Sequence, residues 1–279
     1  MANRSATVGH DGRVTAAQPG NTTPLHADRR RAESFGSVAE RYERARPGYP
    51  DALMDELTSA GPCAVLDVGT GTGKAARMLQ ARWCTVLGVE PDARMAEVAR
   101  SRGVAVEVAR FEEWAPRRRT FEMLTAAQAW HWVDPAVGPA KAASVIRPGG
   151  RLALFWSHLT HRPDALAPLT AVYRRYAPEL AEDSLALGSI AGRDDFRQDL
   201  LAVGQSGGFD PLEVGFFDWH LEYPAGRWLD YLGTCSDHIA LQADRRDALL
   251  EAVGRLIDRD LGGSLTVEYR TVLVSCRRR

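Results

Sequence analysis

Several features that mark large classes of protein are missing from this sequence. It has only four cysteines in 279 residues, and none shows the Cys-x-x-Cys spacing of a metal or redox site. No apolar run approaches the length of a membrane span, and the N-terminus lacks the apolar core of a signal peptide. The formal net charge is only −1, which gives no overall attraction to nucleic acid or to an anionic membrane. We therefore expect a cytoplasmic protein with free thiols that acts on a small molecule, as a monomer or a homodimer.

The remaining composition is that of an ordinary globular chain, with 45% apolar and 25% charged residues. Residues 1–30 are polar and show no periodicity, which predicts a disordered tail. Beyond them, strand patterns alternate with helical patterns, as in a parallel sheet with helical crossovers. We interpret residues 31–279 as one domain.

Residues 65–74 have the pattern of a buried strand, a glycine loop and the start of a helix. The strand is apolar and rich in β-branched residues, as in the centre of a parallel sheet. Gly69, Gly71 and Gly73 then permit backbone angles closed to other residues and let the main chain approach a ligand. Three ligands are consistent with such a loop: a nucleoside triphosphate, a dinucleotide or S-adenosylmethionine.

The spacing excludes a triphosphate, because Val68 and Ala75 stand where a P-loop needs a glycine and a magnesium-binding hydroxyl. A dinucleotide is harder to exclude. Residues 71–76 fit the Gly-x-Gly-x-x-Ala form, and Glu90 lies close to the position of a ribose-binding acid. Asp67 argues against a dinucleotide, because its carboxylate would face the pyrophosphate. The same carboxylate suits a ligand with an ammonium and a sulfonium group.

Residues 67–73 read Asp-Val-Gly-Thr-Gly-Thr-Gly, which resembles motif I of the class I S-adenosylmethionine-dependent methyltransferases. The resemblance implies that S-adenosylmethionine is the cofactor and that Asp67 orients its ammonium group. It also implies that the loop residues line the cofactor site: Gly69, Thr70, Gly71 and Gly73. We expect both Asp67 and Glu90 at a solvent-facing strand end, so that replacing either should spare the fold.

Residues 35–50 resemble the N-terminal lid of small-molecule methyltransferases, including the trans-aconitate methyltransferase group. The shared pattern is Phe-x-x-Val-Ala-x-x-Tyr-x-x-x-Arg-Pro-x-Tyr-Pro, in a helix that includes Phe35 and Val38. The resemblance implies a lid over residues 31–60 in which Tyr42 and Arg46 border the cofactor. The alternative is plain packing for Tyr42 and a surface ion pair for Arg46.

The second and third strands are expected to add cofactor contacts. Glu90 ends the strand over residues 85–90, where its carboxylate can accept both ribose hydroxyls; the alternative is a helix-capping role. After the third strand, over residues 104–109, related methyltransferases often carry Asp-Ala, and this chain departs from that pattern at position 110. Phe111 is equally consistent with ordinary core packing. We assign cofactor contacts near these strand ends to Pro91, Met95, Arg110, Phe111 and Glu112.

The fourth strand, over residues 121–127, delivers residues 128–135 to the same edge of the sheet. This run resembles the Ala-x-x-x-His-Trp-x-Asp segment of the same methyltransferase group. The resemblance implies that Gln128 and Ala129 touch the cofactor, and that Trp130, His131 and Trp132 border the substrate. His131 is the candidate general base, because it is the titratable group between two flat apolar walls. A core tryptophan pair with a hydrogen-bonded histidine is the alternative.

The fifth strand is predicted over residues 151–156, with no strand over residues 157–193. Residues 157–195 and 222–262 are helical insertions, which we interpret as caps that bring Tyr173 and Trp228 to the substrate. The second insertion is predicted to hold helices over residues 224–240 and 244–261. The fold class is therefore α/β, with a doubly wound, Rossmann-like, mostly parallel seven-stranded sheet, a C-terminal antiparallel hairpin and helical cap insertions.

From these observations we expect a methyltransferase that acts on a small molecule. A carboxylate acceptor needs no base, whereas a hydroxyl, an amine or a carbon acid can use His131. We favour a carboxylate or hydroxyl acceptor. The alternatives are an oxidoreductase that uses NAD or NADP, and a regulatory protein that binds S-adenosylmethionine without turnover.

Overall fold

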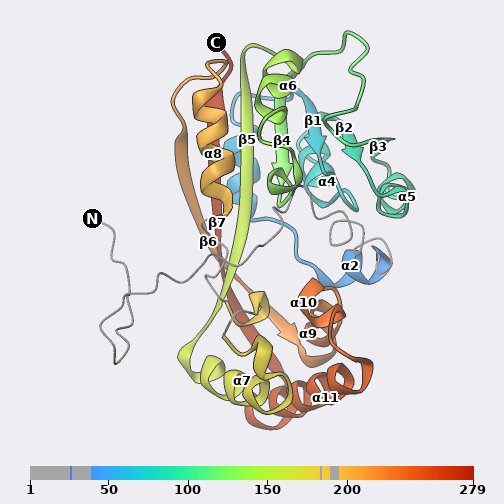
Figure 1. Cartoon of the computed structure of the whole chain (residues 1–279), viewed down its shortest axis with the longest axis vertical. Coiled ribbons are helices and arrows are strands. Elements are labelled where there is room, and N and C mark those ends of the chain that lie inside the picture. Colours follow the sequence, from blue (N-terminus) through green and yellow to red (C-terminus); the bar gives the residue numbers. More distant parts are fainter. Residues whose placement is uncertain (1–25, 27–38, 183, 189–194) are drawn as a thin grey trace, which may run out of the picture.

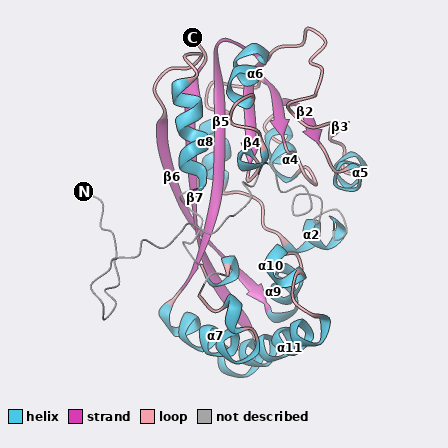
Figure 2. Cartoon of the chain, viewed as in Figure 1, coloured by secondary structure: helices cyan, strands magenta, loops and turns pink. Residues whose placement is uncertain are grey.

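The computed structural model describes residue 26 and residues 39–182, 184–188 and 195–279 of the chain. Its central feature is a seven-stranded sheet with the order β3-β2-β1-β4-β5-β7-β6 (Figure 2). The strands are β1 (Ala64–Val68), β2 (Thr85–Glu90), β3 (Ala105–Val108), β4 (Phe121–Ala127), β5 (Ile146–His161), β6 (Glu213–Pro224) and β7 (Ser264–Arg277). Strands β1 to β5 are parallel to one another, whereas β7 is antiparallel to both β5 and β6. The predicted fold class is confirmed.

Helices cover both faces of the parallel part of the sheet. On one face, α3 (Asp51–Leu57), α4 (Lys74–Gln80) and α5 (Ala93–Ser101) pack apolar stripes against β1 and β2. On the other face, α6 (Gly138–Val145) and α8 (Asp195–Gln205) pack against β4, β5 and β7. Parallel strands need such crossovers, and the right-handed connection places the helices on both sides.

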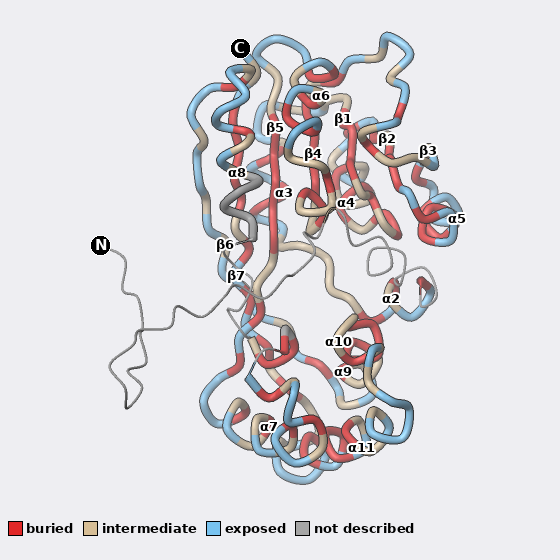
Figure 3. The backbone as a smooth tube through the Cα atoms, in the orientation of Figure 1, coloured by how far each residue is buried: buried red, intermediate tan, exposed pale blue. Residues whose placement is uncertain are grey.

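The three longest strands continue beyond this layered part into a second lobe (Figure 1). Strand β5 has 16 residues, β6 has 12 and β7 has 14, compared with 5 in β1. The second lobe holds α7 (Pro163–Tyr176) after β5, and α9 (Ala225–Leu232), α10 (Ser236–Ile239) and α11 (Ala243–Asp260) after β6. Helices α7, α9 and α11 and the strand ends bury one shared apolar core (Figure 3). Both insertions therefore build a single lobe.

Two expectations about local structure were wrong. Strand β5 does not end near residue 156 but continues to His161, which pairs with Val267 of β7. It continues because the second lobe covers this part of the ladder and buries Leu159 and His161. The helix expected over residues 224–240 is two helices, α9 and α10, separated at residues 233–235.

The N-terminal helix α2 (Ala39–Ala45) lies inside the predicted lid. The predicted tail, apart from residue 26, lies outside the described residues, as do Phe35 and Val38. Within the described ranges, no helix has both the length and the apolar character needed to cross a bilayer.

Candidate functional site

A pocket lies at the carboxyl edge of the parallel strands, where the two lobes meet. Its walls come from the segment between α2 and α3, the glycine loop after β1, the end of β4, and the second lobe. The lining residues are Tyr42, Arg46, Pro47, Gly48, Tyr49, Gly69, Thr70, Gly71, Thr72, Lys74, Ala75, Ala127, Gln128, Ser157, Tyr231 and Tyr269. This is the edge at which open α/β sheets bind their ligands.

The glycine loop has the backbone conformation that its sequence predicts. Gly69, Gly71 and Gly73 have φ angles of 65°, 57° and 80°, in the left-handed region. The amides of Gly69 and Thr70 both donate to the carbonyl oxygen of Val89, at 2.8 and 3.2 Å, which anchors the loop on β2. A Cβ added at Gly69 would lie 2.5 Å from the Cβ of Ala129. Position 69 therefore requires glycine both for its conformation and for its close approach to a neighbour.

Asp67 lies beneath the loop and not at a solvent-facing edge, which corrects the expectation from sequence. It is 1% exposed, and its carboxylate accepts hydrogen bonds from the hydroxyls of Thr70 at 2.6 Å and Thr125 at 2.7 Å. Burial raises its pKa to about 6, although these two hydrogen bonds act in the opposite direction. Replacing Asp67 would leave two buried hydroxyls without an acceptor, so we now expect a cost in stability as well.

Glu90 is buried in the same way, at 7% exposure. Its carboxylate accepts from the amide of Gly71 at 2.8 Å and from the amide of Asp92 at 3.0 Å. Burial raises its pKa to about 7, against the effect of these two amides. Asp92, and not Glu90, caps the following helix, because its carboxylate accepts from the amide of Arg94 at 2.8 Å. Glu90 does not itself line the pocket, but a hydrogen bond joins it to Gly71, which does.

Arg46 brings a positive charge into the pocket from the lid. Its Nε donates to the hydroxyl of Thr234 at 2.8 Å, and its guanidinium also donates to the hydroxyl of Tyr231 at 3.2 Å. The rings of Tyr42 and Tyr231 lie 5.3 and 4.3 Å from its Cζ. All of these partners are neutral, and within the described part of the chain no carboxylate lies within ion-pairing distance of Arg46. The alternative of a surface ion pair is therefore not found there, and Arg46 lines the pocket.

The structure brings six of the predicted cofactor residues to the pocket wall, and these are Tyr42, Arg46, Gly69, Thr70, Gly71 and Gln128. Gln128 has a φ of 56°, and its side-chain amide donates to the carbonyl oxygen of Ser157 at 3.0 Å. Gly73 and Ala129 support the loop from behind, since a Cβ at Gly73 would lie 2.9 Å from Val104. Their packing explains why those positions are small.

The remaining predicted cofactor residues do not line the pocket. Pro91 is exposed, and Met95 is buried in the small core beneath α2. Arg110 and Glu112 form an ion pair of 3.4 Å. Phe111 is buried in the core of the sheet. Asp67 and Glu90 are also absent from the lining, and the cofactor roles of all the predicted residues remain predictions.

Three of the predicted substrate residues lie in apolar cores. Trp130 is 1% exposed in the core on the α6 face of the sheet, and Tyr173 and Trp228 are each 1% exposed in the core of the second lobe. Their side chains are enclosed by packing, so they do not form walls of the pocket. His131 and Trp132 are partly buried, with ring centroids 4.9 Å apart, and Nδ1 of His131 accepts from Nε1 of Trp156 at 3.3 Å. Neither ring belongs to the pocket lining.

Ten lining residues were not among those predicted for the site, and they include Tyr49, Ser157, Tyr231 and Tyr269. Tyr49 stands in the Arg-Pro-Gly-Tyr-Pro segment of the lid, so the lid pattern could have identified it. Tyr231 stacks on Trp228 with ring centroids 4.8 Å apart, and Tyr269 alternates with exposed residues along β7. Both positions have the local pattern of core residues, and only the meeting of the two lobes exposes them to the pocket.

Comparisons with known proteins agree with this geometry. Residues 65–150 match the family model of a methyltransferase domain. The solved structure of a candidate type II methyltransferase from Anaeromyxobacter dehalogenans is 26% identical; the match covers 83% of this chain and 97% of that protein, with a TM-score of 0.62. An uncharacterized methyltransferase of Mycobacterium tuberculosis is 42% identical over 127 residues, which are 44% of this chain and 52% of that protein. A demethylmenaquinone methyltransferase of Deinococcus radiodurans is 32% identical over 161 residues, covering 52% of this chain and 65% of that protein.

The chain spans about half the length of the first of these curated relatives, at 52%. The segment that matches the family model, residues 65–150, contains the glycine loop, Asp67, Glu90 and Gln128. The parts that complete the pocket, namely the lid and the second lobe, lie outside it.

Proposed function

We propose that this chain, whose residues 65–150 match the family model of a methyltransferase domain, uses S-adenosylmethionine to methylate a carboxylate or a hydroxyl of a small molecule. The observation that carries the proposal is the arrangement of charge around the glycine loop. Two carboxylates, Asp67 and Glu90, are buried beneath the loop without lining the pocket, and Arg46 lines the pocket above the loop. None of the three has a partner of opposite charge among the described residues.

These charges are complementary to those of S-adenosylmethionine. Burial holds the pKa of Asp67 near 6 and that of Glu90 near 7, so ionising either carboxyl costs free energy. A ligand that carries an ammonium and a sulfonium group reduces this cost. Its methionine part also carries a carboxylate, which suits Arg46. A dinucleotide would instead place a pyrophosphate dianion beside two acids, which the same electrostatics disfavour.

Bound S-adenosylmethionine supplies an electrophilic methyl group on a positively charged sulfur. The residues of this chain bind and orient the reactants and exclude water, because methyl transfer needs alignment more than it needs an enzyme nucleophile. In this proposal Asp67 orients the ammonium by way of the hydroxyl of Thr70, which donates to Asp67 and belongs to the pocket lining. Glu90 accepts hydrogen bonds from the ribose hydroxyls, and Arg46 binds the methionine carboxylate. The second lobe covers the acceptor side and contributes Tyr231 and Tyr269.

The pocket lining favours an acceptor that needs no general base. Among the described lining residues there is no aspartate, glutamate or histidine. Burial raises the pKa of both Tyr231 and Tyr269, so their hydroxyls stay protonated and act as hydrogen-bond donors. A carboxylate acceptor is already a nucleophile at neutral pH and is matched by such donors, whereas a hydroxyl acceptor has to lose its proton. We therefore favour a small carboxylic acid, ahead of a hydroxyl compound.

Isothermal titration of the purified protein tests the cofactor. S-adenosylmethionine and its demethylated product should both bind, and NAD and NADP should not. Tighter binding of a nicotinamide cofactor would instead support the oxidoreductase alternative. The proposal would then be abandoned.

Methyl transfer to a panel of small carboxylic acids, each paired with the corresponding alcohol, tests the acceptor. Formation of methyl esters from the acids is the expected result. Transfer only to amines or carbon acids would contradict the acceptor class. Tight binding of S-adenosylmethionine with no transfer to any member of a broad metabolite panel would favour the regulatory alternative.

A further inference from the structure

A chain of buried hydrogen bonds joins the two insertions inside the second lobe. Ser184 donates to Oδ2 of Asp237 at 2.9 Å, and Oδ1 of Asp237 pairs with Nδ1 of His238 at 2.8 Å. Nε2 of His238 pairs with the hydroxyl of Tyr173 at 2.7 Å. Ser184 and His238 are 0% exposed, and Tyr173 is 1% exposed. Since Tyr173 and Ser184 belong to the first insertion and the other two residues belong to α10, the chain fixes α10 against α7.

The proton positions along this chain follow from its chemistry. Burial opposes ionisation of Asp237, but its hydrogen bonds with His238 and with the Ser184 hydroxyl hold the pKa of Asp237 at about 2. A carboxylate only accepts hydrogen bonds, so Nδ1 of His238 carries the proton and Nε2 accepts from Tyr173. Burial raises the pKa of Tyr173 well above its ordinary value, so that hydroxyl keeps its proton. Every donor in the chain has an acceptor, which gives α10 one fixed position.

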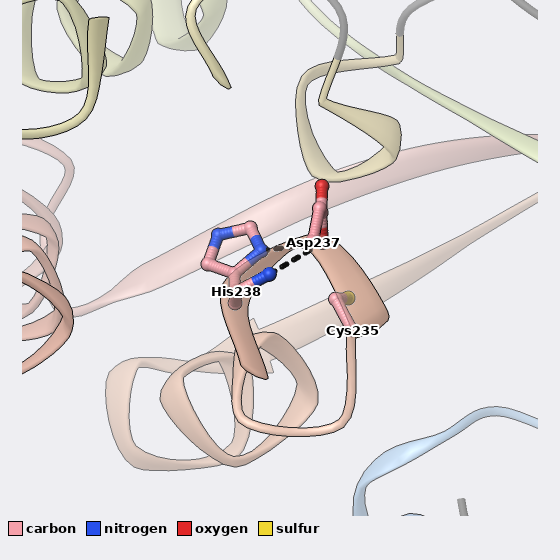
Figure 4. Close-up of side chains that lie close together, drawn as sticks. All are labelled: Cys235, Asp237 and His238. Atoms are coloured by element: carbon pink, nitrogen blue, oxygen red, sulfur yellow. Dashed lines mark hydrogen bonds and ion pairs between the residues drawn. The ribbon is translucent and has the colours of Figure 1, made fainter. Parts of the chain in front are cut away.

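A metal site is the other use that this cluster suggests. Cys235, Asp237 and His238 offer three ligand atoms within 4.8 Å of one another. However, Figure 4 shows the imidazole of His238 turned toward the carboxylate of Asp237, and both groups are already engaged in the hydrogen bonds above. The guanidinium of Arg46 lies 3.3 Å from the sulfur of Cys235, where it would repel a metal cation. The arrangement therefore argues against a metal and for a structural link to Arg46.

That link runs through the short turn between α9 and α10. Thr234 accepts from Nε of Arg46 at 2.8 Å through its hydroxyl and from Nη2 at 3.1 Å through its carbonyl oxygen, and Cys235 accepts from the same Nη2. Thr234 and Cys235 are 0% and 1% exposed, and they directly precede α10. The hydrogen bonds that fix α10 therefore also fix the atoms that hold the guanidinium.

We propose that Tyr173, His238 and Asp237 are positioning residues that set the orientation of Arg46 in the ligand pocket, although none of the three lines it. The inference rests on the proposed function in one respect, which is that Arg46 binds the methionine carboxylate of S-adenosylmethionine. Loss of one link lets α10 move, and the guanidinium then loses its fixed direction toward the pocket. The expected consequence is a weaker preference for ligands that carry the carboxylate.

The first experiment compares S-adenosylmethionine with its decarboxylated analogue by isothermal titration. Tyr173→Phe removes one hydroxyl from the chain, and Tyr176→Phe is the matched control on the same helix, with no hydroxyl hydrogen bond among the described residues. The parent and the control should prefer S-adenosylmethionine, and Arg46→Met should abolish the preference. Tyr173→Phe should reduce it about five-fold, as expected for one hydrogen bond, with affinity for the analogue retained. A lowered melting temperature with an unchanged preference would show a purely structural role and overturn the proposal.

The second experiment needs no ligand and separates this inference from the proposed function. A double-mutant cycle combines Tyr173→Phe with Arg46→Met and measures urea unfolding of the protein alone. The effects should be non-additive, because each change removes part of one connected network. His238→Gln in the same cycle provides a second, independent link. Additive effects in both cycles would overturn the positioning role. If the parent fails to bind S-adenosylmethionine while the cycles show coupling, the proposed function fails and the positioning of Arg46 stands.

Discussion

The carboxylate of Glu43 in α2 accepts a hydrogen bond from Arg77 of α4 at 2.6 Å. Lys74 lies 3.4 Å from the same carboxylate, and Arg102 lies 3.6 Å from it. Glu43 is only 8% exposed, so one buried carboxylate lies within ion-pairing distance of three basic side chains. Because Lys74 begins the helix that follows the glycine loop, this group ties the lid to the loop on which the proposed cofactor rests.

Replacing Glu43 should therefore loosen the lid. Glu43→Gln keeps the shape of the side chain but leaves Lys74 and Arg77 without a charge partner among the described residues. We expect a loss of roughly 2–4 kcal/mol in the free energy of unfolding, measured in urea, as for one partner removed from a buried ion pair. Glu40→Gln is the control, because its side chain is 67% exposed and lies 3.9 Å from Arg102. Similar small losses in the two variants would contradict the assigned role of Glu43.

Glu90 should make stability depend on pH in a defined direction. Burial raises its pKa to about 7, so the folded state holds this proton more tightly than the unfolded state does. The resulting stabilisation is complete below the ordinary carboxyl pKa and is lost as the pH rises through 7. Glu90→Gln cannot lose it, so its unfolding free energy relative to the parent should rise by roughly 2–3 kcal/mol between pH 5 and pH 8.

Urea unfolding at several pH values checks this, with the exposed Glu113→Gln as the control. A difference between Glu90→Gln and the parent that stays constant with pH would refute the assignment. The same variant should bind S-adenosylmethionine more weakly, since the ribose loses its carboxylate partner.

Substitutions at two glycines with similar backbone angles allow the cost of backbone strain to be measured separately from the cost of a steric clash. Gly69 and Gly103 have φ angles of 65° and 86°, but only at Gly69 would a Cβ meet a neighbour, at 2.5 Å. Gly103→Ala should cost about 1–2 kcal/mol from the backbone alone. Gly69→Ala should cost roughly 1–3 kcal/mol more, because the loop or Ala129 has to move, and it should also weaken cofactor binding. Thermal unfolding and titration measure both effects, and equal costs at the two sites would show that the contact with Ala129 is unimportant.

His131 should contribute little to turnover on a carboxylic acid. The ring is partnered by Trp156 and does not line the pocket, and a carboxylate acceptor needs no base. His131→Ala should therefore reduce kcat by less than about ten-fold, whereas loss of a general base costs about 10²–10⁴-fold. Steady-state kinetics on the best acid from the acceptor panel decides between these outcomes. A loss in the larger range, with cofactor affinity retained, would restore His131 as the base.

The backbone conformation of the glycine loop and the place of Glu90 at a strand end were predicted from local sequence, and the binding roles assigned to them stay predictions. The glycine loop was recognisable because its backbone angles depend on the residues themselves, and Glu90 because it ends a strand beside that loop. The burial of Asp67 was not predictable in this way, since it depends on Thr125, which lies 58 residues away along the chain.

The aromatic residues show the same limit of local patterns more clearly. Tyr173, Trp228 and Tyr231 all stand on helical apolar stripes, and nothing in the stripes distinguishes the ring that reaches the pocket from those that fill the core. That distinction arises only when the lid meets the second lobe, through contacts such as Arg46 to Thr234, which are 188 residues apart. The length of β5 was underestimated for the same reason, because its last residues are stabilised by helices from two distant insertions.

The continuous strands between the lobes determine how a ligand can enter. Eleven consecutive residue pairs join β5 to β7, from Arg151 with Arg277 to His161 with Val267, and β6 adds a second ladder along the same length. Two lobes that share such a ladder cannot rotate apart about a hinge between them without breaking hydrogen bonds of the ladder. The lid is held instead by side chains, through Glu43 on one side and Arg46 on the other. We therefore expect the predicted lid, held by Glu43 and Arg46, to be the part that moves when a ligand enters the pocket.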